Sequence, residues 1–140
     1  MTINDLLARN VLENPDKPYV FFKDETVTYG ELDRLSNKVA NALISQGVKK
    51  GDRVSIMLPN NLEFLYIMFG CFKLGAVIVP LNTALSTDEV NYVIDHSEAV
   101  VLLTDDQFIE RIHSIRGDLK LLKTIIVVSD EKPGDDSLLF

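Results

Sequence analysis

The chain has 140 residues and a mass of 15.7 kDa, which is the size of one domain. Apolar residues make up 46% of it and charged residues 25%, a composition that is typical of globular proteins and excludes intrinsic disorder. The 21 acidic residues outnumber the 14 basic ones, and the net charge is −7. This balance argues against nucleic-acid binding and against docking on an anionic membrane, because both need clustered cations.

The sequence shows no signal for export or for membrane insertion. Residues 1–10 lack a continuous hydrophobic run, and the most apolar stretch, residues 62–74, is too short to span a bilayer and contains Glu63 and Lys73. The single Cys71 excludes an intramolecular disulfide and fits a reducing compartment. We therefore expect no transmembrane segment and a cytoplasmic location.

The first 28 residues are expected to form a leading segment and a β-hairpin. Residues 19–22 and 26–28 are rich in aromatic and β-branched side chains, and the polar Lys23, Asp24 and Glu25 separate them. The hairpin should pack on the edge of the unit that follows.

Residues 29–128 are predicted to form a parallel α/β unit. Four strand-like runs lie near residues 54–58, 77–80, 100–103 and 125–128, and segments of helical periodicity connect them. Near-continuous apolar strands joined by helices are typical of a parallel sheet with right-handed crossovers and helices on both faces. The expected fold class is therefore α/β, with one four-stranded parallel sheet and an N-terminal hairpin.

Capping signals mark where the helices should begin. In each, a side chain that can cap the helix is followed three residues later by Glu or Gln. The predicted pairs are Thr28 with Glu31, Asn60 with Glu63, Ser86 with Glu89, and Thr104 with Gln107. Gly47 and Gly75 should end the first two helices, and the second helix is apolar on almost every side.

No motif in the chain carries recognisable catalytic chemistry. Residues 70–76 have the glycine spacing of a phosphate-binding loop, but Ala76 replaces the required lysine and the order runs from helix to strand. We interpret this stretch as the end of a helix with Gly75 as its cap. No G-x-G-x-x-G pattern follows any predicted strand.

Single reactive residues also favour structural roles. His96 and His113 lie on different elements, and Cys71 lies in an apolar helix without a reactive setting. Asp105 and Asp106 lie at a strand-to-helix junction, where carboxylates complement the helix dipole, and a catalytic role is the weaker alternative. Ser55, Ser86 and Ser97 lack a nucleophile elbow, and Asp135 and Asp136 lie in a polar stretch. We assign no catalytic, cofactor-binding or metal-binding residue.

Three stretches nevertheless have a recognisable pattern. Residues 27–32 read V-T-Y-G-E-L, and residues 73–82 read K-L-G-A-V-I-V-P-L-N. Between these two lie G-D-R-V at residues 51–54 and P-N-N-L-E-F at residues 59–64. They resemble characteristic segments of the adenylate-forming superfamily, which includes acyl-CoA synthetases, adenylation domains of peptide synthetases, and luciferases, and whose first two motifs are written L-T-Y-x-E-L and K-x-G-x-x-x-V-P-L-[DN]. Asn82 and the following residues look most like the acyl-CoA synthetase branch, and a luciferase-type or aryl-acid ligase is the alternative.

The resemblance implies the N-terminal portion of a longer ATP-dependent acyl-CoA ligase, which would use ATP, Mg²⁺ and CoA and act on a carboxylic acid. The superfamily's phosphate loop, Mg-ATP segment, ribose-binding aspartate and catalytic lysine do not occur in residues 1–140, so this part alone should be inactive. The remainder of the enzyme would be its partner. Residues 129–140 resemble a truncated linker that ends in Leu138, Leu139 and Phe140, and we expect an apolar face that promotes self-association. A free-standing, non-catalytic binding or interaction module on the same scaffold is the alternative function.

Overall fold

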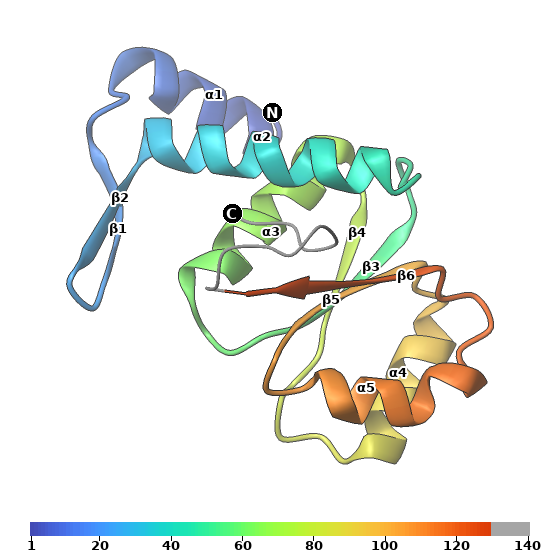
Figure 1. Cartoon of the computed structure of the whole chain (residues 1–140). Coiled ribbons are helices and arrows are strands. Elements are labelled where there is room, and N and C mark those ends of the chain that lie inside the picture. Colours follow the sequence, from blue (N-terminus) through green and yellow to red (C-terminus); the bar gives the residue numbers. More distant parts are fainter. Residues whose placement is uncertain (130–140) are drawn as a thin grey trace.

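The computed structural model describes residues 1–129, and the predictions for residues 130–140 lie outside this range (Figure 1). The chain begins with helix α1 (Ile3–Glu13), the hairpin strands β1 (Pro18–Phe22) and β2 (Glu25–Thr28), and helix α2 (Tyr29–Ser45). The remaining elements are β3 (Arg53–Met57), α3 (Leu62–Leu74), β4 (Val77–Pro80), α4 (Thr87–Ser97), β5 (Val101–Asp105), α5 (Ile109–Ile115), the short 3-10 helix η1 (Arg116–Asp118), and β6 (Thr124–Val128).

The four predicted strands form one sheet in the order β4-β3-β5-β6, and every pair is parallel. Val54 of β3 is in register with Ile78 of β4 on one side and with Val101 of β5 on the other. Leu103 of β5 is in register with Ile126 of β6. The predicted parallel α/β unit is therefore confirmed.

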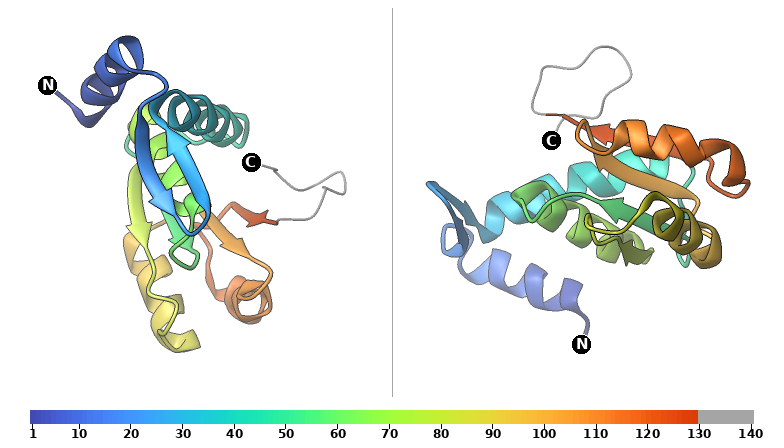
Figure 2. Two further views of the ribbon diagram at one scale, coloured as in Figure 1. Left: turned by 90° about the vertical axis from the view of Figure 1, so that its left-hand side faces the viewer. Right: turned by 90° about the horizontal axis from the view of Figure 1, so that it is seen from below.

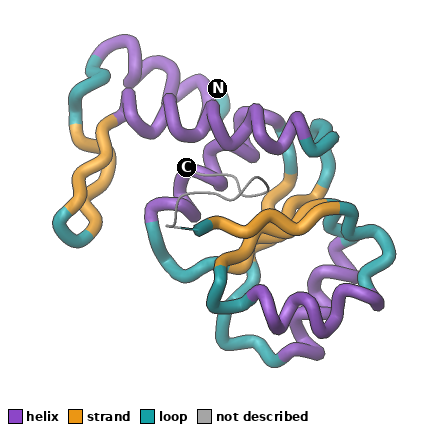
Figure 3. Tube along the Cα trace, in the orientation of Figure 1, coloured by secondary structure: helices purple, strands orange, loops and turns teal. Residues whose placement is uncertain are grey.

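Helices cover both faces of the sheet (Figures 2 and 3). Successive strand residues point to opposite faces, so Ile56 and Leu103 join a core with α1, α2 and α3. Met57 and Leu102 join a second core with α4 and α5. Such two-sided burial explains why the strands are apolar without alternation.

The hairpin forms a separate two-stranded sheet and packs on helices rather than extending the parallel sheet. The Tyr19 ring meets Tyr29 edge-on at a centroid distance of 5.2 Å and Phe69 of α3 at 5.8 Å. Val27 is buried in the core that α2 and α3 form. Packing on the helices stabilises this hairpin, because two strands alone are marginally stable in water.

Helix α1 is an element that the sequence reasoning missed. A capping box opens it: Thr2 Oγ1 accepts from the Asp5 N–H at 3.2 Å, and Asp5 Oδ2 accepts from the Thr2 N–H at 2.7 Å. Asn4 Nδ2 then donates to the Phe72 carbonyl of α3 at 2.7 Å. Only Leu7 of this helix is buried, although Ile3, Leu6, Leu7 and Val11 recur at helical spacing, a signal from which the helix could have been predicted.

Two of the four predicted helix starts are confirmed in full. Thr28 Oγ1 accepts from the Glu31 N–H at 3.2 Å, and Glu31 Oε2 accepts from the Thr28 N–H at 2.9 Å. Ser86 and Glu89 form the same reciprocal pair. Both boxes satisfy backbone N–H groups that the first turn of a helix leaves without partners.

The other two predicted helix starts are corrected. The cap of α3 is Asn61 rather than Asn60, since Asn61 Oδ1 accepts from the Phe64 N–H at 3.0 Å. Thr104 caps no helix, because it is a fully buried residue of β5 whose hydroxyl donates to the Met57 carbonyl at 3.1 Å. Helix α5 begins only at Ile109, without a side-chain cap.

Replacing Thr28 with Ala should destabilise the chain by about 0.5–2 kcal/mol, because the Glu31 N–H loses its acceptor and Glu31 loses half of the box. Thr28→Ser is the matched control, since it keeps the hydroxyl, and its midpoint of denaturant unfolding should stay close to that of the unchanged chain. Equal midpoints for the Ala and Ser variants would show that the capping box contributes nothing.

Candidate functional site

The parallel sheet has a topological switch point between β3 and β5. The chain leaves β3 for α3 on one face, whereas it leaves β5 for α5 on the opposite face, as their separate cores show. In open α/β sheets such a divergence opens a crevice outside the carboxyl ends of the two strands, and ligands bind there. This edge is therefore the candidate site.

A small polar cavity of about 160 Å³ lies at the switch point. Leu58 and Val128 line it from the ends of β3 and β6, and Ser129 follows the latter. The start of α3 and the turn after β5 supply the other lining residues, Asn61, Glu63, Asp105, Asp106 and Gln107. Three carboxylates at one cavity would attract groups that are cationic or that donate hydrogen bonds.

The carboxyl group of Asp105, which lines this cavity, has a shifted pKa. Partial burial raises its pKa above the usual value of 3.8, and the nearby Asp106 acts in the same direction. Hydrogen bonds from the backbone partly oppose this, and the Gln107 N–H donates to Asp105 Oδ1 at 3.0 Å. Ser129 Oγ donates to Asp106 Oδ2 at 3.4 Å, which ties the end of β6 to the same turn.

The predicted helix-dipole role of Asp105 and Asp106 is corrected by this geometry. The two residues lie at the end of β5 and in the turn after it, and α5 begins later, at Ile109. Asp105 instead closes that turn, accepting from Gln107 with its side chain and from the Phe108 N–H with its carbonyl at 3.2 Å. The pair therefore shapes the rim of the cavity.

A second cavity of about 500 Å³ lies beside the first, outside β3 and β4. Its wall includes the motif residues Pro80, Leu81 and Asn82 together with Thr83. Asn82 orders the loop, because its Oδ1 accepts from the Ala84 N–H at 2.9 Å and its carbonyl accepts from the Leu85 N–H at 3.1 Å. The motif therefore shapes a wall of this cavity.

Arg111 of α5 holds the same loop, and the sequence reasoning did not identify it. Its guanidinium donates to the Leu85 carbonyl at 3.0 Å and to the Thr83 carbonyl at 3.1 Å, and it lies 5.7 Å from the Phe108 ring centre. No motif includes Arg111, and the contact joins residues that are far apart in the sequence. A planar guanidinium is suited to two such acceptors at once.

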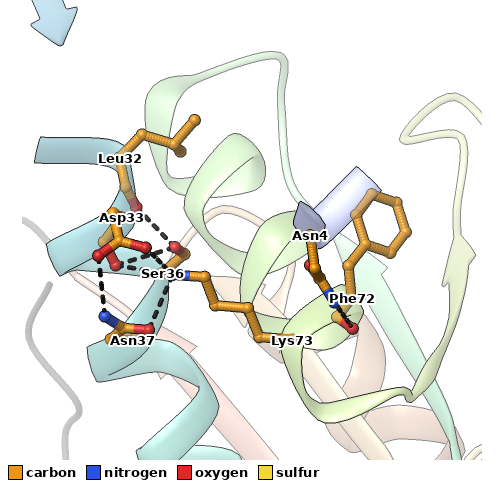
Figure 4. A network of polar contacts seen from close by, with 7 residues as sticks. All are labelled: Asn4, Leu32, Asp33, Ser36, Asn37, Phe72 and Lys73. Carbon is orange, nitrogen blue, oxygen red and sulfur yellow. Dashed lines mark hydrogen bonds and ion pairs between the residues drawn. The ribbon is translucent and has the colours of Figure 1, made fainter. Parts of the chain in front are cut away.

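The lysine and the glycine of the second motif have structural roles, and Figure 4 shows the contacts of the lysine. Lys73 Nζ reaches from α3 to α2, where it lies 2.7 Å from Asp33 Oδ1 and donates to Asn37 Oδ1 at 2.8 Å. Gly75 ends α3 in the left-handed conformation, with φ of +75°. The interpretation of residues 70–76 as a capped helix end rather than a phosphate loop is confirmed.

The other reactive residues lie apart from one another. The pKa of the buried Cys71 thiol is raised to about 12 by burial, so it is an inert core thiol. His96 is exposed and stacks on Tyr92 at 5.3 Å, and His113 is exposed on α5. Within residues 1–129, no group of three or more His, Cys, Asp or Glu side chains is placed to hold a metal ion.

The three serines lie on separate elements too. Ser86 caps α4, Ser97 Oγ donates to the Ile94 carbonyl at 3.0 Å, and the buried Ser55 lies in β3. None of the helices in the described part of the chain is long and apolar enough to span a membrane.

Comparison with known proteins agrees with the motifs. The model of the AMP-binding enzyme family matches residues 7–139. The chain belongs to this family. Two similar proteins are the medium/long-chain-fatty-acid–CoA/3-oxocholest-4-en-26-oate–CoA ligase of Mycobacterium marinum, 33% identical over 96% of this chain, and the crotonobetaine/carnitine–CoA ligase of Salmonella paratyphi B, 35% identical over 79% of it.

Solved structures share the fold of this chain. An anthranilate CoA ligase in complex with anthranoyl-AMP superposes on 96% of this chain with a TM-score of 0.87 and 34% identity, and this chain covers 26% of it. The N-terminal domain of FACL13 from Mycobacterium tuberculosis superposes with a TM-score of 0.83 and 28% identity, over 98% of this chain and 39% of that one. The chain spans about a quarter of the length of the curated relatives, 24% and 22% of the two ligases above.

Replacing Asp105 with Asn should leave the protein at least as stable at pH 7, because Asn keeps the Oδ1 acceptor and removes a carboxylate that burial disfavours. A raised pKa means that the folded chain holds the proton more tightly, so the unchanged protein gains stability as the pH falls through the folded pKa towards 3.8. The difference in the free energy of unfolding between the Asp105→Asn variant and the unchanged protein should therefore shrink as the pH falls over that range.

Denaturant unfolding at a series of pH values between about 3 and 7 measures this difference. Asp118→Asn, at an exposed position of η1, is the control for the loss of one negative charge. A stability advantage of the Asp105→Asn variant that grows as the pH falls would contradict the raised pKa of Asp105.

Proposed function

We propose that this chain is the N-terminal portion of an ATP-dependent acyl-CoA ligase. The observation that carries the proposal is the family match over residues 7–139 together with relatives that are named as CoA ligases and are about four times as long. Three motifs of the acyl-CoA synthetase type in the same order support it. The carboxyl edge of the sheet, with its two adjacent cavities, would face the rest of the enzyme.

The reaction would have two steps. A carboxylate oxygen of the acid attacks the α-phosphorus of ATP, which forms an acyl adenylate and releases pyrophosphate. The CoA thiolate then attacks the acyl carbonyl and displaces AMP, which gives the acyl-CoA. Both steps depend on positioning and on stabilising developing negative charge.

Residues 1–129 would supply scaffold to this reaction rather than reacting groups. The carboxylates that residues 1–129 place at the switch point are not grouped as a metal site, so these residues do not fit a Mg²⁺ ion. We assign no step of the reaction to that ion. What this part supplies is the fixed loop of Asn82, held by Arg111, and the polar rim at Asp105. The catalytic groups would come from the remainder of the protein.

We propose a medium- or long-chain fatty acid as the substrate and the cytoplasm as the location. The name of the Mycobacterium marinum relative supports the acid class, and the anthranilate ligase structure makes an aryl acid the competing choice. The location rests on the reduced, buried Cys71 and on the use of ATP and CoA.

The isolated 140-residue chain should not catalyse acid-dependent exchange of pyrophosphate into ATP, because the motifs that would bind ATP are not in its sequence. The protein that contains this chain at full length should catalyse the exchange with a fatty acid and should form acyl-CoA when CoA is added. Exchange above the no-protein control by the short chain would show that it holds catalytic residues.

Failure of the full-length protein with fatty, aryl and small carboxylic acids would contradict the ligase proposal. That result would favour the alternative of a binding or interaction module on the same scaffold. Testing the three acid classes in parallel also separates the fatty-acid choice from the ligase assignment.

A further inference from the structure

An apolar groove runs between the hairpin and the first half of α3. Its volume is about 260 Å³, and nearly all of its lining is apolar. The hairpin and α3 contribute the apolar residues, Val20, Phe22, Leu62, Phe64, Leu65 and Met68, and Asn60 and Asn61 close one end. Leu62 is buried, whereas the other five apolar side chains are only partly covered by the described chain.

The groove exists because α3 has more apolar sides than its neighbours cover. Its inner residues Ile67, Phe69 and Cys71 are buried in the core with α2 and the sheet. Phe64, Leu65 and Met68 pack against this core but are only partly buried, and the groove lies beside them. A contiguous apolar surface of this kind calls for an apolar occupant.

The end of the described chain lies beside this groove. Asn61 lines the groove and also lines the cavity at the switch point. Ser129, the last described residue, lines that same cavity. The chain therefore leaves β6 at a cavity that shares Asn61 with the groove.

The sequence that follows Ser129 has the chemistry that the groove requires. Residues 130–137 are polar and contain four acidic side chains, and the next three residues are Leu138, Leu139 and Phe140. Nine residue steps lead from Ser129 to Leu138, and an extended chain of that length spans up to about 30 Å. A polar spacer of this length lets an apolar segment reach from the end of β6 to the groove.

We propose that the groove between β1 and α3 binds the segment of residues 138–140 of the same chain. The carboxylates of the spacer and those of Glu63, Asp105 and Asp106 repel each other, which disfavours a path that settles in the switch-point cavity. Burial of Leu138, Leu139 and Phe140 covers the open side of α3.

The methionines provide a selective test in the 140-residue chain. The chain has three, at positions 1, 57 and 68, so methyl-¹³C labelling of methionine gives one NMR signal for each. Met68 lines the groove, and Met57 is fully buried in the core on the opposite face. Met68 is therefore the reporter and Met57 the internal control.

The triple variant Leu138→Ser, Leu139→Ser, Phe140→Ser should shift the Met68 signal and leave that of Met57 in place, because an aromatic ring and two aliphatic side chains leave the groove. The variant Ser137→Ala, which changes the neighbouring spacer residue without changing its charge, is the matched control and should leave both signals unchanged. Dilution should not alter the Met68 position, since the contact is within one chain.

An unchanged Met68 signal in the triple variant would overturn the proposal. A concentration-dependent Met68 signal would also overturn it, because the occupant would then be a second copy of the chain. That result would agree with the self-association expected from the sequence. Equal shifts of Met57 and Met68 would overturn it as well, since the effect would then belong to the whole fold instead of the groove. None of these results depends on ATP chemistry, so they are independent of the ligase proposal.

Discussion

The close contact between α2 and α3 is the constraint on which the rest of the structure depends. A Cβ atom on Gly70 would lie only 2.6 Å from Val39 Cγ1, so a glycine is needed for the two helices to approach as they do. At the edge of this contact, Lys73 pairs with Asp33 and Asn37, and its side chain is only 17% exposed. Together these contacts fix α3 above the sheet, and the hairpin and α1 pack on the resulting layer.

This constraint gives the family motifs a physical explanation. The first motif opens α2 with the Thr28–Glu31 box, and the second supplies Lys73 to the helix contact, Gly75 to the end of α3, and Asn82 to the loop after β4. Each of these positions is set by a backbone or packing requirement. Their shared effect is to bring the ends of β3, β4 and β5 to one edge, where the cavities lie.

Much of this fold was predictable because its signals are local. The four strands are apolar runs, and Thr28 and Ser86 satisfy helix ends through residues three positions away. Thr104 misled the prediction because its burial in the sheet outweighs a local capping pattern. Arg111 and Asn4 escaped it because their partners lie on other elements, and no sequence pattern marks such contacts. The cavity at Asp105 likewise required the order of the strands.

The central claim is that the motif residues in this member of the AMP-binding enzyme family build a scaffold rather than a site. Replacing Lys73 with Met in the full-length protein tests it most directly, because Met keeps much of the length of the side chain and removes the three polar contacts to α2. The variant should lose about 1–3 kcal/mol of stability, while its KM values for ATP, acid and CoA stay unchanged. Unchanged stability together with a raised KM for ATP would contradict the account, since Lys73 would then act on the substrate.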